Sequence, residues 1–175
     1  MYRFTNPIIW LCRIRHRCGY GVHSPYAFRF IVDVLYERLS YYAYRQLDKS
    51  LPLKDRFRVR KVLHMLLRIS NWHQPATVAC ITNSHIVARY IKAGCNKAQV
   101  TGCCPEAKID LCWLDEPNNE VVTRLHEHSV LLLDHLNKHR DWFMSLPSVV
   151  SFDLYDIGIA FFDTKYNKQH YIVNF

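Results

Sequence analysis

The sequence predicts an α/β fold with a mixed, mostly parallel β-sheet and an N-terminal helical extension. Short β-prone runs alternate with helical segments after residue 73, which is typical of a parallel sheet. The last two apolar segments, 148–163 and 169–175, follow each other closely and predict an antiparallel C-terminal hairpin that makes the sheet mixed. Before residue 73, apolar residues recur at helical spacing.

Length and charge define two regions. A chain of 175 residues can form one domain with a sizeable core, and its hydrophobic content of 50% excludes a disordered chain. The net charge of +8 is uneven, because residues 1–75 carry 14 Lys and Arg against 4 Asp and Glu. We therefore expect a basic helical region, residues 1–72, packed on a near-neutral α/β region, residues 73–175, as one compact unit.

The sequence also favours a cytoplasmic protein without a membrane partner. No apolar run approaches the roughly 18 residues that span a bilayer. The opening "MYRFTNPIIWLCRIRHR" has a short apolar patch and no small-residue cleavage site. The seven cysteines are scattered through apolar stretches, which indicates reduced thiols in the cytosol.

Two helices are expected in the basic region. Ser24 and Pro25 form a helix start, after which Phe28, Ile31, Val32, Leu35 and Leu39 follow at helical spacing and should face inward. A second helix is expected over residues 53–70, with basic residues in its first two turns. Positive charge at this end opposes the helix dipole, so the charges could serve an anionic partner or reflect surface drift.

An anionic partner is the hypothesis that the basic region suggests. Arg13, Arg15, His16 and Arg17 form one short run, and the aromatic residues Trp10 and Tyr20 lie nearby for stacking on bases. Nucleic acid or an acidic protein would fit this composition, although no recognition-helix, zinc or RNA-binding motif accompanies it.

The α/β region begins with a strand, a tight turn and a helix in "ATVACITNSHIVARYIKAG", residues 76–94. Further strands are expected at 99–103, 109–115 and 128–135. Asp115 and Asp134 stand at the ends of the last two, and ligands of open α/β sheets bind at that edge. The turn Thr82-Asn83-Ser84-His85 contains no glycine, although glycine usually lets the backbone approach a nucleotide there.

Both ends of the chain resemble one family. The segments "YGVHSPYAFRFIVDVLY", "YYAY" and "SVVSFDLYDIGIAFFDTKYNKQHYIVNF" are similar to the opening and ending of small S-adenosylmethionine-dependent methyltransferase-like proteins common in Bacteroidetes. These segments cover somewhat under half of the chain. The resemblance implies a Rossmann-like methyltransferase fold with S-adenosylmethionine as its cofactor.

The middle of the chain departs from that family. Against the family pattern "TILEIGTSLG", the acid becomes Cys80 and the two glycines become Thr82 and Ile86, while Ser84 matches. Thr101 stands where the second strand usually ends in an acid. Asp115 matches an acid of the family. The resemblance therefore implies a vestigial cofactor site at Thr82, Ser84, Thr101 and Asp115, in which Ile86 adds bulk where a ligand would approach.

A helix–strand–helix portion of the family is missing between "VTGCCPE" and "IDLCWLD". We therefore expect a reduced sheet of about five to six strands, with residues 99–103 as a short strand at its edge. The N-terminal helices, including the aromatic run at 41–44, should cover the face that this deletion bares, or a homodimer should share it.

The sequence is compatible with three functions. The first is a degenerate methyltransferase-like protein without methyl-transfer activity, retained for binding or structure. The second is an active O-methyltransferase with an atypical pocket, in which Asp134 and His135, matching an Asp-Asp pair of the family, act as general base or metal ligand near the acceptor. The third is the basic anion-binding domain. His126, His128, His135 and His139 read as polar surface residues, so no resident metal site is predicted.

Overall fold

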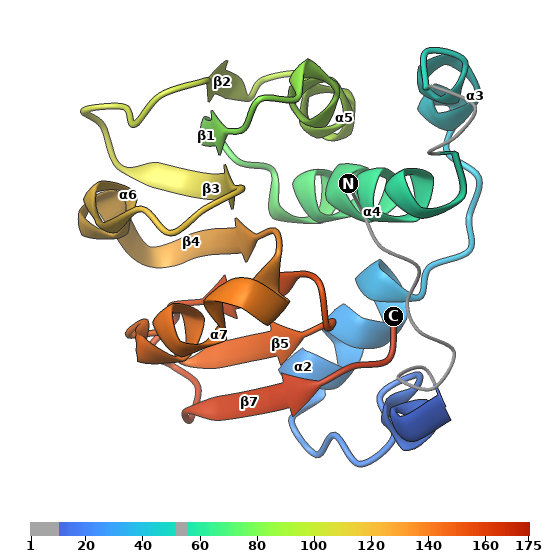
Figure 1. Ribbon diagram of the computed structural model, residues 1–175, viewed down its shortest axis with the longest axis vertical. Helices are drawn as coiled ribbons and strands as arrows, with labels where there is room; N and C mark the ends of the chain where they lie inside the picture. Colours follow the sequence, from blue (N-terminus) through green and yellow to red (C-terminus); the bar gives the residue numbers. More distant parts are fainter. Residues whose placement is uncertain (1–10, 52–55) are drawn as a thin grey trace.

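The computed structural model describes residues 11–51 and 56–175, which form a seven-stranded sheet between two layers of helices (Figure 1). The N-terminal segments are η1 (Ile14–His16), α2 (Pro25–Arg29), the π-helical η2 (Phe30–Leu35) and α3 (Tyr42–Asp48). The α/β region follows with α4 (Arg56–His73), β1 (Thr77–Ile81), α5 (His85–Gly94), β2 (Gln99–Thr101), β3 (Ile109–Leu114), α6 (Asn119–Arg124), β4 (Leu125–Leu133), α7 (Leu136–Ser145), β5 (Val150–Asp153), β6 (Gly158–Phe161) and β7 (Gln169–Ile172).

The sheet confirms the predicted mixed α/β class. Its strand order is β2-β1-β3-β4-β6-β5-β7. The first four strands are parallel, β6 runs antiparallel to β4 and β5, and β7 is parallel to β5. The expected short edge strand is confirmed, because β2 has only three residues and pairs on one side with β1. A homodimer through this edge stays a prediction.

Two details of the predicted sheet are wrong. The sheet has seven strands rather than five to six. The antiparallel hairpin lies within segment 148–163, which was predicted as one strand, because the chain reverses between β5 and β6 at Tyr155, where φ is +78°. Segment 169–175 then supplies β7, a parallel strand at the far edge. A single positive φ inside an apolar run leaves no clear signal in hydrophobicity alone.

The first face of the sheet carries the larger hydrophobic cluster. Helices α2, η2, α3, α4 and α5 pack there, on the right of the sheet in Figure 1. The ring of Phe30 from η2 lies 5.0 Å from that of Phe152 on β5 and 4.9 Å from that of Phe161 on β6, measured between ring centroids. Tyr44 of the predicted aromatic run is buried in the same cluster. The N-terminal segments thus share one core with the sheet.

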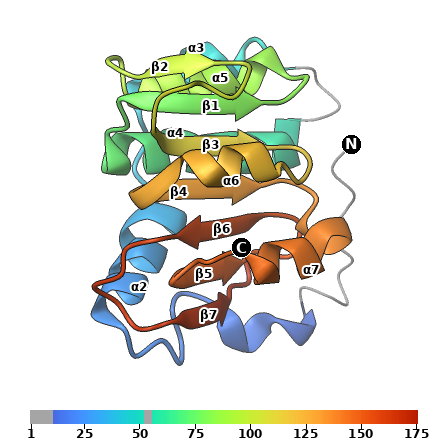
Figure 2. The ribbon, with the colours of Figure 1, turned by 90° about the vertical axis from the view of Figure 1, so that its left-hand side faces the viewer.

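The second face has a thinner cover. Only α6 and α7 pack on it among the described residues, and they lie over β3 to β6 (Figure 2). No described helix stands in front of β1 on this side. The N-terminal helices therefore pack beside α4 and α5 instead of covering this face. Ala79 of β1 is small and buried in the cluster on this face, and Ile81 is partly buried against the same cluster.

Helix α2 begins where the sequence predicts, but the inward residues differ. The Ser24 hydroxyl accepts a hydrogen bond from the Ala27 amide. Phe28 and Val32 are 44% and 37% exposed, and Leu39 lies beyond the helical segment and is 71% exposed. The buried residues of η2 are Phe30, Ile31, Val34 and Leu35. The π-helix, closed by a bond from the Tyr36 amide to the Ile31 carbonyl, turns a different face inward than an α-helix would.

Residues 102–108 carry the chain from β2 across β1 to β3 without a helix or strand. Figure 2 shows this connection passing in front of β1. It crosses two strand spacings, about 10 Å, and returns about 10 Å along the strands. These seven residues span about 25 Å when extended but only about 10 Å as a helix, so the connection has to be extended.

Asp153 is a buried carboxylate at the end of β5. Its side chain is fully inaccessible and accepts hydrogen bonds from the Arg13 guanidinium at 3.0 Å, from Arg140 of α7, and from the Tyr155 amide at 2.7 Å. Burial raises the pKa of Asp153, but these hydrogen bonds outweigh it and hold the pKa below its ordinary value. One carboxylate therefore ties the N-terminal segment and α7 to the sheet.

No helix of the described residues is both long enough and apolar enough to cross a bilayer.

We predict that Gly94→Ala destabilises the fold by about 1–3 kcal/mol through overpacking. A Cβ atom on Gly94 would overlap the Leu67 carbonyl of α4 and lie 2.8 Å from the Cβ of Ser70. Urea unfolding measures the effect. Gly102→Ala is the matched control, because a Cβ there meets nothing within 4 Å. Equal stability of the two variants would contradict the close α4–α5 contact.

We predict that Asp153→Asn lowers the free energy of unfolding at pH 7 by about 3–5 kcal/mol, because two guanidinium groups lose their buried counter-charge. The pKa of Asp153 in the folded protein lies below the ordinary value of an aspartate, so the carboxylate stabilises the fold at any pH above that ordinary value. This contribution disappears as the pH falls through the folded pKa, and the gap between variant and wild type should shrink. Asp141→Asn, at an exposed position on α7, serves as control in unfolding titrations from pH 7 to 2. A gap that is constant over this range would disprove the linkage.

Candidate functional site

A cavity of about 570 Å³ opens at the carboxyl edge of the parallel strands, between β1 and β3. At this point the chain leaves β1 for β2 on one side and later returns to β3 on the other. The loops that follow the two strands diverge to opposite sides, which creates the crevice where open α/β sheets bind ligands. The cavity lining comes from the ends of four strands: Ile81, Thr82 and Asn83, then Gly102, then Asp115, Glu116, Pro117 and Asn118, and finally His135, Lys138 and His139.

The turn after β1 holds its shape without glycine. The Thr82 amide donates to the Cys80 carbonyl at 3.2 Å, and the Thr82 hydroxyl accepts from the Ser84 amide at 3.1 Å. No residue from Thr82 to Ile86 has a positive φ. The expected obstruction by Ile86 is wrong, because this side chain packs on the first-face cluster and is not part of the cavity lining. Thr82 lines the cavity, whereas Ser84 lies outside the lining.

Asp115 is the predicted site residue with the best-defined geometry. It follows β3, and its amide donates to the Ile81 carbonyl at 3.3 Å. The buried indole of Trp113 donates from Nε1 to Oδ1 of Asp115 at 3.0 Å. This bond fixes the carboxylate at the cavity wall, where it can accept hydrogen bonds from hydroxyl groups of a ligand.

Asp134 and His135 have different surroundings. Asp134 is 4% exposed, lies outside the cavity lining, and accepts a hydrogen bond from the His135 amide at 2.7 Å. His135 lines the cavity from a left-handed conformation with φ of +54°. Nδ1 of His135 lies 3.6 Å from Oδ2 of Asp134. Asp134 therefore supports the strained backbone that presents His135 to the cavity.

The hydroxyl group of Thr101 is engaged by the main chain and does not line the cavity. Its hydroxyl group lies 3.2 Å from the Val78 carbonyl and 3.1 Å from the Cys103 carbonyl, in hydrogen-bonding geometry with both. It is absent from the cavity lining. The structure thus brings Thr82, Asp115 and His135 together and leaves Ser84, Thr101 and Asp134 outside.

Sequence reasoning missed several lining residues that carry charge or amide groups. Asn83 and Asn118 supply amides, and Lys138 supplies a cation one helical turn after His135. The sequence feature that could have identified Asn83 and Asn118 is their position shortly after a predicted strand, and the same feature identified Asp115. Lys138 lies beyond that signal, because it depends on how α7 starts.

The residues at this edge do not fit S-adenosylmethionine in the manner of the resembled family. Cys80, at the position of the first family acid, is buried in the first-face cluster. Burial, with a contribution from nearby Asp115, raises the pKa of the Cys80 thiol to about 12. Thr101, at the position of the second acid, bonds to main-chain carbonyls. Asp115 alone of these positions offers a carboxylate to the cavity.

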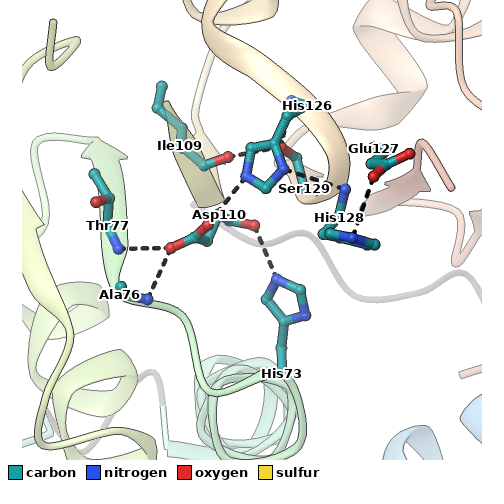
Figure 3. A network of polar contacts seen from close by, with 9 residues as sticks. All are labelled: His73, Ala76, Thr77, Ile109, Asp110, His126, Glu127, His128 and Ser129. Atoms are coloured by element: carbon teal, nitrogen blue, oxygen red, sulfur yellow. Dashed lines mark hydrogen bonds and ion pairs between the residues drawn. The ribbon is translucent and has the colours of Figure 1, made fainter. Parts of the chain in front are cut away.

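A second polar cluster lies at the opposite, amino edge of the sheet (Figure 3). Oδ2 of Asp110 accepts hydrogen bonds from the Ala76 and Thr77 amides, each at 2.8 Å. Oδ1 lies 3.0 Å from Nε2 of His126. The His128 amide donates to Nδ1 of His126, so Nε2 carries the proton that Asp110 accepts.

This cluster joins four elements at their ends. Nε2 of His73, at the end of α4, donates to the main-chain carbonyl of Asp110 at 3.0 Å. Burial lowers the pKa of His73, and the Asp110 carbonyl opposes that shift only in part. Burial raises the pKa of Asp110, but the two amides and His126 outweigh it, so this pKa lies below its ordinary value. The arrangement fixes α4, β1, β3 and β4 relative to one another.

In the part of the chain that the structure describes, no group of three or more His, Cys, Asp or Glu side chains could hold a metal ion.

Comparison of the chain with protein-family models, with curated proteins and with solved structures found no match.

We predict that Asp110→Ala lowers the free energy of unfolding by about 2–4 kcal/mol, because two amides and an imidazole lose a charged acceptor. His128→Ala is the matched control. Its side chain is 57% exposed and pairs with exposed Glu127, so its loss should change stability by less than about 0.5 kcal/mol. Chemical denaturation at pH 7 compares them. Equal effects would contradict a structural role for the Asp110 cluster.

Proposed function

We propose that this protein is a degenerate member of the S-adenosylmethionine-dependent methyltransferase-like class, reduced in its Rossmann-like fold and retained as a binding protein without methyl-transfer activity. The ligand site of this proposal is the cavity between β1 and β3. The proposal rests on the resemblance of both chain ends and on the chemistry of the residues at the carboxyl edge.

The main support for this proposal comes from Cys80 and Thr101, which stand at the two positions where the resembled family has acidic residues that bind the cofactor. The Cys80 side chain belongs to the hydrophobic cluster on the first face of the sheet. The Thr101 hydroxyl is hydrogen-bonded to the main chain. Each charged hydrogen bond that is lost costs about 1.5–3 kcal/mol, so two of them weaken cofactor binding by roughly two to four orders of magnitude.

The open cavity supports binding rather than a purely structural role. Its volume of about 570 Å³ lies within the range of small-molecule sites. Asp115 is held by Trp113, and Asn83 and Lys138 add donors along the wall. These groups suit a small polar molecule with hydroxyl groups.

An active O-methyltransferase is the second candidate, favoured by one observation. Asp115 and His135 line the same cavity, so a cofactor near the first would bring an acceptor near the second. Asp134, however, is 4% exposed and accepts a hydrogen bond from the His135 amide. In an active enzyme it would act through His135 as a positioning residue.

We predict that isothermal titration detects no binding of S-adenosylmethionine or S-adenosylhomocysteine tighter than about 1 mM, since the charged partners of the ribose are missing. Asp115→Ala is titrated in parallel, because any residual heat from this cavity should depend on Asp115. A dissociation constant in the low micromolar range that rises at least about tenfold in Asp115→Ala would refute the proposal and favour the enzyme. Methyl transfer to a small hydroxylated acceptor, lost in His135→Ala, would do the same.

A further inference from the structure

A second cavity, of about 360 Å³, lies between the N-terminal segments and α4. Its walls are the end of η2 and the residues that follow it, one side of α4, and Phe175. It is separate from the cavity at the carboxyl edge, with which it shares no lining residue.

Cationic side chains dominate this second cavity. Arg60, His64 and Arg68 follow at intervals of four along α4 and therefore lie on one face of the helix. Lys61 and Arg38 add two further basic side chains, and Glu37 is the one acidic side chain of the lining. Arg38, Arg60, Lys61 and Arg68 therefore concentrate positive charge in one cavity.

Arg68 gives the strongest indication of a missing counter-charge. The residue is 7% exposed and lines the cavity. Its guanidinium donates to the carbonyls of Val34 at 2.6 Å and Leu35 at 2.9 Å, and NH1 lies 3.5 Å from the Tyr44 hydroxyl. All three partners are neutral, and no described carboxylate lies within 4.0 Å of Arg68. Buried charges in proteins are ordinarily paired.

Lys61 is a second cation of this cavity, and its side chain is exposed. Its Nζ lies 4.1 Å from the ring centroid of Phe175, and the described residues place no carboxylate within ion-pair distance of it. Loss of water around it, with the charges of Arg68 and Arg17, lowers the pKa of Lys61. An anion in the cavity would relieve this repulsion.

His64 is already engaged on its other side. Nε2 of His64 lies 2.9 Å from Oδ1 of Asp48, and its ring stacks on Tyr44 with 3.6 Å between centroids. Burial, followed by the opposing effect of Asp48, leaves the pKa of His64 lowered. The ligand charge is therefore met by Arg38, Lys61 and Arg68, with Arg60 beside them at the rim.

We propose that this cavity, which we name the basic cavity, binds the phosphate groups of a small phosphorylated molecule. Guanidinium and ammonium groups recognise phosphate by charge-assisted hydrogen bonds, and several of them together favour a diphosphate over a single carboxylate. The aromatic rings of Tyr36 and Phe175 at the wall leave an apolar surface for the remainder of such a molecule.

Isothermal titration of the full chain with inorganic pyrophosphate tests this site. We expect saturable binding with one site per chain that weakens as salt increases. Lys61→Gln and Arg38→Gln change accessible residues and should fold normally, and each should weaken binding by at least about fivefold. Arg68 is left intact because it also caps η2.

Two control variants give the experiment its resolution. Lys97→Gln removes one exposed positive charge outside both cavities and should leave the affinity within about twofold of wild type. Lys138→Gln removes the lysine of the carboxyl-edge cavity and should do the same.

Several results would overturn the proposal. Among them are the absence of saturable binding up to about 5 mM pyrophosphate and equal weakening by Lys97→Gln. Dependence on Lys138 instead of Lys61 would place the anion in the carboxyl-edge cavity. Binding of a short RNA that pyrophosphate does not displace, and that Lys61→Gln leaves unchanged, would assign the basic charge to a nucleic-acid surface instead.

Discussion

Residues 102–108 return the chain from β2 to β3 in one extended crossing over β1, and much of the architecture follows from this return. Because β2 and β3 flank β1, the crossing makes the space between β1 and β3 the point where the strand order reverses. Because the crossing is too short for a helix, β1 has no helical cover on that face, and Ala79 is small there. The cavity lined by Gly102 and Asp115 opens at the carboxyl edge of the sheet, between β1 and β3.

Buried charge connects the sheet to its surroundings in two contrasting ways. Asp153 is inaccessible, and two arginines and an amide meet its charge, so it closes the sheet against the N-terminal segment and α7. Arg68 is nearly as buried, but its hydrogen-bond partners are two main-chain carbonyls and a tyrosine hydroxyl, all of them neutral. The first arrangement is electrostatically complete, whereas the second leaves charge that a ligand can compensate. Arg13 belongs to the complete arrangement, which weakens its place in the basic run expected to meet an external anion.

The two cavities differ in how far the sequence could predict them. The carboxyl-edge cavity follows from strand order, and its lining combines Asp115 and Glu116 with Lys138 and two histidines. The basic cavity depends on how three distant segments meet, since η2, α4 and Phe175 each supply one wall. The proposed small-molecule site and the proposed anion site thus lie in separate cavities, with no lining residue in common. The amino-edge cluster around Asp110 belongs to neither cavity and fixes the starts of β1, β3 and β4.

The sequence by itself determined the α/β class, the cap at Ser24, the edge position of residues 99–101, and the place of Asp115 at the end of a strand, because periodicity and turn chemistry are local properties. It could not determine the π-helical turn that buries Phe30 and Val34, or the reversal at Tyr155 that divides one apolar run into two strands. Nor could it tell that Ile86 packs on the core and that Asp134 lies outside the cavity lining, where it accepts a hydrogen bond from the His135 amide. Those outcomes depend on which side chains find partners across the folded molecule, and such contacts between distant segments form only in the tertiary structure.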